Sequence, residues 1–234
     1  MVILMNQTRR ERIRETTFEE IKSVAWKQIA EEGVPALSLR AIARDMGMTA
    51  PGLYRYYPSR DDLVTALIIE AFNSFSQYLE TARDALPTND HTGRYRAVCE
   101  AYFRWAVINP SRYTLIFGSP VPGYQMGEAA YPSAQRGFLV LQAVIGEALA
   151  DDKIHMPADV RPLSQELLAR YITLQKLGMP YDPIATHLAL ATWSTLHGIT
   201  SLYLYGYVGR FLAEQVEGFV LQEIEQLVTL LGLE

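Results

Sequence analysis

Two short helical patterns, joined by a tight glycine turn, restrict the possible folds of this chain more than any other feature. The stretch SLRAIARDMG predicts one helix, which Ser38 caps and Gly47 ends with a positive φ. Thr49 then caps the helix of TAPGLYRYYP, with Pro51 in its first turn and Pro58 as its stop. Two short helices with such a turn between them form a helix-turn-helix, so we expect this motif here.

Helical patterns continue on both sides, and no run of alternating apolar residues predicts a strand. Upstream, Thr16 or Thr17 can form a capping box with a glutamate three residues later, and Gly33 ends that helix. Downstream, we expect helices at about 59–85, 94–108, 111–117, 133–150, 160–177, 183–207 and 209–231. The fold class that follows is all-α.

The formal net charge of −5 hides a difference between two parts of the chain. Residues 1–62 carry ten Lys and Arg against nine Asp and Glu, whereas residues 63–234 carry eleven against seventeen. A locally basic face matters more for phosphate contact than the total charge does. We therefore place a domain boundary here, with the helix-turn-helix and a basic N-terminal arm in 1–62 and a larger helical domain in 63–234.

The second helix of the motif has the composition of a recognition helix. Leu53 packs it against the preceding helix, and Tyr57 is expected in the core. Small residues at its start let the backbone approach base edges, and tyrosine hydroxyls can donate to phosphate oxygens. For Tyr54, simple packing is the alternative. The residues left to face DNA are Ala50, Pro51, Gly52, Tyr54, Arg55 and Tyr56.

The spaced pattern Leu-Tyr-x-x-Phe/Tyr-x-x-Lys/Arg-x-x-Leu is met without a gap by Leu53, Tyr54, Tyr57, Arg60 and Leu63. With EEG and SLRAIARDMGM before it, the segment 17–67 resembles the DNA-binding domain of TetR-family transcriptional regulators. The resemblance implies a double-stranded DNA operator as partner. It also implies that Tyr54, Tyr56 and Arg60 hold phosphates.

The same resemblance assigns roles to residues nearer the start of the motif. Arg40 reaches a base edge or a phosphate, and Thr49 combines the helix cap with a phosphate contact. Pro51 and Gly52 approach the bases. The arginines of the arm either reach an adjacent groove or stay solvated; they are Arg9, Arg10, Arg12 and Arg14.

In the second domain, Trp193, His197 and Gly198 form a Trp-x-x-x-His-Gly pattern. With AYFRWAVINPSRYTLIFGSPVPGY, it resembles the C-terminal domain of the TetR subgroup named after this WHG pattern. Trp193 and His197 share a helical face, where they contact a ligand or pack in the core. His187 and His197 lie about 15 Å apart along a helix, so no metal site is predicted.

Aromatic and flexible side chains near the proline-rich loop GSPVPGYQMGEAAYP predict a pocket for a small molecule. Few charges accompany them, which favours an apolar or aromatic effector over a nucleotide or a sugar phosphate. Ordinary aromatic core is the alternative for each of them, and no cofactor is predicted. The candidate ligand-binding residues are Trp105, Tyr113, Phe117, Tyr124, Met126, Trp193 and His197.

The last two helices predict a homodimer. Apolar residues recur at spacings of three, four and one between Leu212 and Leu231, a stripe wider than one neighbouring helix needs. The preceding helix is apolar and nearly uncharged, so the pair would expose a large hydrophobic patch in a monomer. A four-helix bundle made by two copies buries this patch, as the family resemblance also implies.

The resemblance implies a cytoplasmic, sequence-specific DNA-binding transcriptional regulator, in its usual form a repressor that a small effector releases from the operator. The sequence lacks the His-Glu-x-x-His, Gly-x-Ser-x-Gly, Walker and dinucleotide motifs, so we do not expect an enzyme. The uncharged stretch 183–209 contains too many polar residues for a membrane span. The open alternative is a helical small-molecule-binding adaptor, or an enzyme, that keeps the fold without binding an operator.

Overall fold

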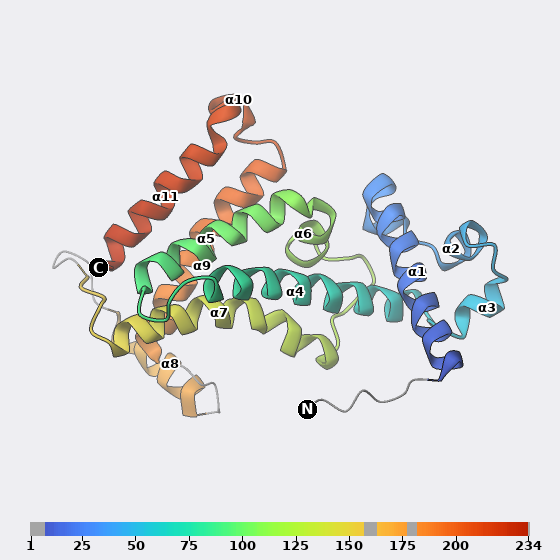
Figure 1. The fold of residues 1–234 in the computed structure, drawn as a ribbon, viewed down its shortest axis with the longest axis horizontal. Coiled ribbons are helices and arrows are strands. Elements are labelled where there is room, and N and C mark those ends of the chain that lie inside the picture. The colour runs from blue at the N-terminus through green and yellow to red at the C-terminus, as the bar shows by residue number, and fades with distance from the viewer. Residues whose placement is uncertain (1–7, 157–162, 177–181, 234) are drawn as a thin grey trace. The chain divides into compact units, whose positions relative to one another are not determined.

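The computed structural model describes residues 8–156, 163–176 and 182–233 (Figure 1). Over these residues the regular structure is helical, apart from one isolated antiparallel bridge between Ile154 and Leu233. The predicted all-α fold class is confirmed. None of the helices in the described ranges is both long and apolar enough to cross a membrane.

The helices form two compact units, and the long helix α4 (Arg60–Asp84) contributes to both. The first unit comprises the described residues up to Ala71 together with Ser111–Ala130. The second comprises Phe72–Pro110 and the described residues from Tyr131 onwards. The domain boundary at residue 62 stays a prediction about the chain.

The first unit is built on the predicted helix-turn-helix. Its core contains Ile21, Ile42, Leu53, Leu63 and Leu67, none of which has any solvent exposure. The hydrophobic effect therefore holds three helices and the start of α4 around one centre. The elements are α1 (Arg9–Glu32), η1 (Val34–Ala36), α2 (Leu39–Asp45), α3 (Ala50–Tyr54), the start of α4, most of α6 (Pro110–Phe117) and η2 (Glu128–Ala130).

The start of α1 differs from the prediction. Thr8 makes the capping box: its hydroxyl accepts from the Glu11 amide at 3.3 Å, and the Glu11 carboxylate accepts from the Thr8 amide at 2.8 Å. Thr16 and Thr17 lie inside the helix, where each hydroxyl donates to a carbonyl oxygen four residues earlier. The capping box predicted at these two threonines was therefore wrong, because the Thr-x-x-Glu spacing occurs three times and does not say which copy starts the helix.

In the second unit, α5 packs against α7, α9 and α11. Gly137 of α7 lies so close to the Phe75 ring that a Cβ at this position would be 2.5 Å from a ring carbon. Close packing of helices around aromatic side chains thus organises this unit. The elements are the end of α4, α5 (His91–Ile108), α7 (Tyr131–Ala150), α8 (Gln165–Lys176), α9 (Pro183–Leu204), α10 (Gly209–Leu212), η3 (Ala213–Gln215) and α11 (Val216–Leu231).

The last predicted helix is broken rather than continuous. A short α10 and a 3-10 turn precede α11, and Ala213 between them has a φ of 44°, which a residue with a Cβ adopts only under strain. The prediction of one helix over 209–231 was wrong at its start. Part of the helix expected at 160–177, including Pro162, lies outside the described residues.

The apolar stripe of α11 faces the interior of its own chain. Val220 is 3% exposed and Ile224 is 1% exposed, and α11 packs on α5 and α9. The expectation that α11 contributes this stripe to an exposed patch of the last two helices was therefore wrong, whereas Leu190 and Leu202 of α9 are exposed. The helical spacing of apolar residues indicates that their side of the helix is buried. It does not indicate whether the helix that covers them belongs to the same chain.

Candidate DNA-binding and effector sites

The helix-turn-helix is capped as the sequence predicts. The Ser38 hydroxyl accepts from the Ala41 amide, and Gly47 in the turn has a φ of 65°. The Thr49 hydroxyl accepts from the Gly52 amide at 3.2 Å, which starts α3. A Cβ at Gly52 would lie 3.1 Å from that hydroxyl oxygen, so a larger residue there would crowd the cap.

The residues predicted to face DNA differ in how far solvent reaches them. Tyr54 is 40% exposed. Gly52 is buried, and Ala50, Tyr56 and Arg60 are half-buried. The other predicted contacts are exposed: Arg40, Thr49, Pro51 and Arg55. Their contacts with DNA stay predictions.

Two tyrosines after Leu53 have different positions. Tyr57 is buried, as expected. Phe18 of α1 packs edge-to-face against both Tyr56 and Tyr57, with ring centroids 5.1 and 5.4 Å apart. Such pairs add about 0.5–1.5 kcal/mol beyond the area that they bury. The end of the recognition helix is therefore fixed to α1.

Arg60 has partners that the sequence did not reveal. Its Nε donates to the Leu37 carbonyl at 3.2 Å, and its Nη2 donates to the Val34 carbonyl at 3.0 Å. The side chain thus ties the start of α4 to the connection between α1 and α2. It holds the motif in place, whether or not it also contacts a phosphate.

Glu70 joins three helices of the first unit, and the sequence reading missed this group. Its carboxylate forms ion pairs with Lys22 at 2.7 Å and Arg112 at 2.8 Å and accepts a hydrogen bond from the Trp26 indole at 3.0 Å. The Arg112 guanidinium lies 4.6 Å from the centroid of the Trp26 ring. Burial acts to raise the pKa of Glu70, but the hydrogen bonds from Lys22 and Trp26 and the nearby charges outweigh it and lower the pKa. The Glu70 clasp, made by these four residues, connects α1, α4 and α6. No local sequence pattern indicates this group, because its members lie far apart in the sequence.

Three of the predicted ligand residues meet in the second unit around a ring that we did not predict. Phe75 packs edge-to-face on Trp105 at 5.0 Å and on Trp193 at 6.0 Å. His197 shares a hydrogen bond of 3.1 Å with the hydroxyl of Tyr102, whose ring also contacts Phe75. Burial lowers the pKa of His197, so its imidazole is neutral at pH 7. An uncharged aromatic cluster results.

The other four predicted ligand residues belong to the first unit. Tyr113 is fully buried beside Phe117, at 5.2 Å between ring centroids. The Tyr124 hydroxyl shares a hydrogen bond of 2.9 Å with Thr65, and Met126 is exposed. Their part in a ligand site stays a prediction.

A groove of about 310 Å³ lies between α7 and α9 in the second unit. Phe138 and Trp193 pack edge-to-face on its wall, with ring centroids 5.7 Å apart. Its lining residues are Ala134, Gln135, Phe138, Leu139, Thr186, Leu190 and Trp193.

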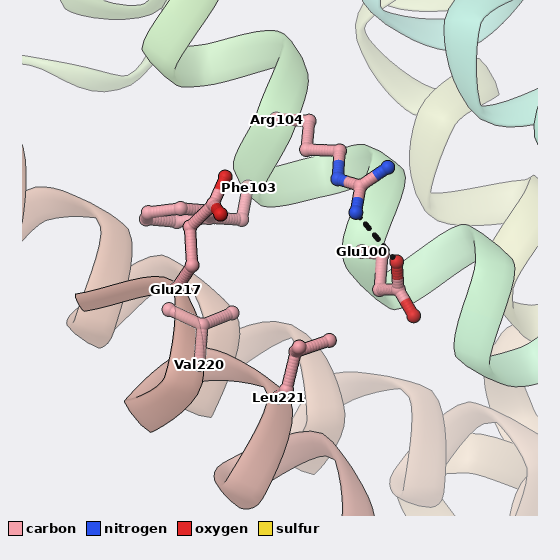
Figure 2. Close-up of a pocket in the computed structure, with 6 residues that line it drawn as sticks. All are labelled: Glu100, Phe103, Arg104, Glu217, Val220 and Leu221. Atoms are coloured by element: carbon pink, nitrogen blue, oxygen red, sulfur yellow. Dashed lines mark ion pairs between the residues drawn. The ribbon is translucent and has the colours of Figure 1, made fainter. Parts of the chain in front are cut away.

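A smaller hollow of about 30 Å³ lies between α5 and α11 (Figure 2). Figure 2 shows Phe103 on one side and Val220 with Leu221 on the other, beside an ion pair of 3.2 Å between Arg104 and Glu100. A hollow of this size admits water but is too small for an organic effector.

Models of known protein families match two separate segments of the chain. Residues 21–67 match the model of bacterial regulatory proteins of the tetR family, and residues 95–227 match the model described as a tetracyclin repressor-like C-terminal domain. The chain belongs to the TetR family. This TetR-family protein is 32% identical over 204 residues to the HTH-type transcriptional regulators Mb1846 of Mycobacterium bovis and Rv1816 of Mycobacterium tuberculosis, covering 84% of each chain.

Solved structures agree with this assignment. A crystal structure assigned to the regulatory protein SCO4313 has a TM-score of 0.78 at 33% identity and covers 95% of this chain and 100% of its own. RolR in complex with resorcinol has a TM-score of 0.54 at 16% identity, covering 95% and 91%, which shows a shared fold alone. The TetR-family protein is therefore a transcriptional regulator with a helix-turn-helix DNA-binding domain, and its relatives are transcriptional regulators as well. The WHG subgroup stays an interpretation.

Proposed function

We propose that this TetR-family regulator is a cytoplasmic repressor that binds its operator as a homodimer and leaves it when a small apolar or aromatic molecule binds the helical domain. Repression and release by an effector are typical of the family. The observation that carries the DNA part is the exposed surface of α2 and α3, where Arg40, Tyr54 and Arg55 all reach solvent. These side chains supply charge and hydroxyl donors suited to phosphates and base edges.

The proposed base contact is tested by Arg40→Ala. An arginine that reads a base edge contributes about 1–3 kcal/mol of discrimination, so we expect the variant to lose preference at one operator position. The measurement is equilibrium binding to an operator selected from a random-sequence duplex pool, with single base changes along it. Lys27→Ala, which removes an exposed charge from α1, is the control and should keep the full preference. Uniform weakening by Arg40→Ala at every position would make Arg40 a phosphate contact instead.

We place the effector in the groove between α7 and α9. Its walls are mostly apolar and aromatic, with Gln135 as a polar group to orient a ligand. The hydroxyl of Thr186, which also lines the groove, already donates to the Asp182 carbonyl and accepts from Gln142. The volume of about 310 Å³ lies at the lower end of the range for small-molecule sites, roughly 300–1,000 Å³. The groove therefore favours a compact aromatic compound over a long lipid.

Leu190→Trp should fill this groove and prevent effector binding. The probe is a panel of small phenols that includes resorcinol, the ligand in the RolR structure. A compound at about 100 times its Kd should stabilise the parent by about 2.7 kcal/mol, and this thermal shift should disappear in the variant. Leu167→Trp on α8, an exposed leucine outside the groove, is the matched control. An equal shift in Leu190→Trp and the parent would place the effector elsewhere.

For the dimer, the proposed surface is the exposed side of α9 rather than the buried stripe of α11. Uncharged residues recur along it at helical spacing, all exposed except the half-buried Gly198. They form what we call the α9 row: Ile184, Ala191, Ser194, Gly198, Leu202 and, directly after the helix, Tyr205. A Cβ at Gly198 would meet no atom within 4 Å, so a partner helix has room to approach closely. An uncharged row of this kind supports a bundle made by the last helices of two copies.

A further inference from the structure

The first turns of α1 carry charged side chains beyond the core of the first unit. Residues 8–16 are helical from Arg9 and exposed throughout. Arg10 and Arg14 lie four residues apart, on the helical side that continues to Phe18 and Ile21. Ile21 is fully buried. The side of α1 that faces the core farther along the helix is therefore the side that presents these two arginines.

Aromatic contacts connect this side of α1 to the recognition helix. The Arg14 guanidinium lies 5.6 Å from the centroid of the Phe18 ring, and that ring packs on Tyr56, which follows α3. A cation–π contact of this kind attracts the guanidinium to the face of the ring. The Arg14 charge is thus held near the end of the helix proposed to enter the groove.

The acidic side chains on these turns are outnumbered, because residues 8–16 carry four arginines against Glu11 and Glu15. Glu11 folds back on Thr8, whose amide and hydroxyl both donate to its carboxylate at 2.8 and 2.9 Å. These hydrogen bonds lower the pKa of Glu11 and engage its carboxylate with its own helix end. Arg10 and Arg14 remain as two cations on the side turned towards α3.

We infer that Arg10 and Arg14 bind the DNA phosphate backbone beside the recognition helix, so that operator contact extends from α3 onto the first turns of α1. The inference rests on the proposed placement of α3 at the DNA. Each arginine displaces counterions at one phosphate and reads no base. These two contacts therefore raise the affinity for any DNA duplex, whereas the sequence specificity comes from α2 and α3.

The double variant Arg10→Gln/Arg14→Gln tests this inference through the salt dependence of binding. Affinity is measured by fluorescence anisotropy over a KCl series, with a random-sequence duplex of about 30 base pairs and with the selected operator. The slope of log K against log [salt] should become shallower by about 1.8 per protomer on both duplexes. Circular dichroism and the melting temperature should match the parent, because both side chains are exposed.

Arg9→Gln/Arg12→Gln is the matched control. It removes the same charge from the same turns but from the opposite side of the helix, so its slope should change by less than half as much. Equal changes in the two double variants would indicate a general charge effect and overturn the inference. A parental slope in Arg10→Gln/Arg14→Gln would do the same while leaving the proposed DNA site intact. A parent protein that binds neither duplex would defeat the proposed function together with the inference.

Discussion

Leu202→Glu is expected to give a folded monomer that no longer holds its operator. Leu202 is 46% exposed on the α9 row, so a carboxylate there stays solvated in the monomer and is desolvated only when a second copy packs on it. A monomer has one helix-turn-helix and contacts one half-site of the operator. Operator affinity should therefore fall by about 100-fold or more, which corresponds to about 2.7 kcal/mol. Sedimentation velocity gives the mass, and circular dichroism gives the helix content.

Val220→Glu on α11 is the informative comparison for this dimer test. Val220 is 3% exposed inside its own chain, so a charge there should unfold the second unit rather than separate two folded copies. A Leu202→Glu variant that sediments as a dimer would remove the α9 row from the interface. A parent that is monomeric at micromolar concentration would remove the dimer itself from the proposal.

Gly137→Ala should destabilise the second unit by about 1–3 kcal/mol, the usual cost of overpacking a close-packed core. The new Cβ would lie 2.5 Å from Cε1 of Phe75. That ring is held between Tyr102 and Trp105 and cannot swing aside without disturbing both. Thermal unfolding followed by circular dichroism measures the loss.

Gly146→Ala is the matched control for Gly137→Ala, because it lies in the same helix. Its Cβ would meet its nearest neighbour, the Cβ of Ala185, at an ordinary contact distance of 3.9 Å. Replacing a helical glycine by alanine in open space should stabilise α7 by about 0.5–1 kcal/mol. Melting temperatures that move in the same direction in both variants would show that Phe75 yields more readily than its ring contacts indicate.

Local signals predicted the helix-turn-helix because each signal and its effect lie within a few residues. The hydroxyls of Ser38 and Thr49 bond to amides three residues later, and Gly47 adopts its positive φ with no Cβ to oppose it. The start of α1 was missed because its exposed first turns have no apolar stripe to reveal them. Capping patterns alone did not distinguish Thr8 from Thr16 and Thr17.

Contacts between distant segments could not be predicted in this way. Composition identified Trp105, Trp193 and His197 as candidates, but nothing in their spacing pointed to Phe75, which contacts both tryptophan rings. The bonds from Arg60 to the carbonyls of Val34 and Leu37 were missed for the same reason. Periodicity shows which side of a helix is buried and leaves open which helices meet there.

The Glu70 clasp limits how DNA-binding heads can be exchanged between relatives. A hybrid regulator spliced at residue 62 would take Lys22 and Trp26 from one parent and Glu70 and Arg112 from the other. Unless the incoming head carries a cation and an indole at matching places, the carboxylate loses two of its three donors at the junction. Recombination, natural or engineered, should therefore succeed between parents that share these four side chains and fail between parents that differ in them.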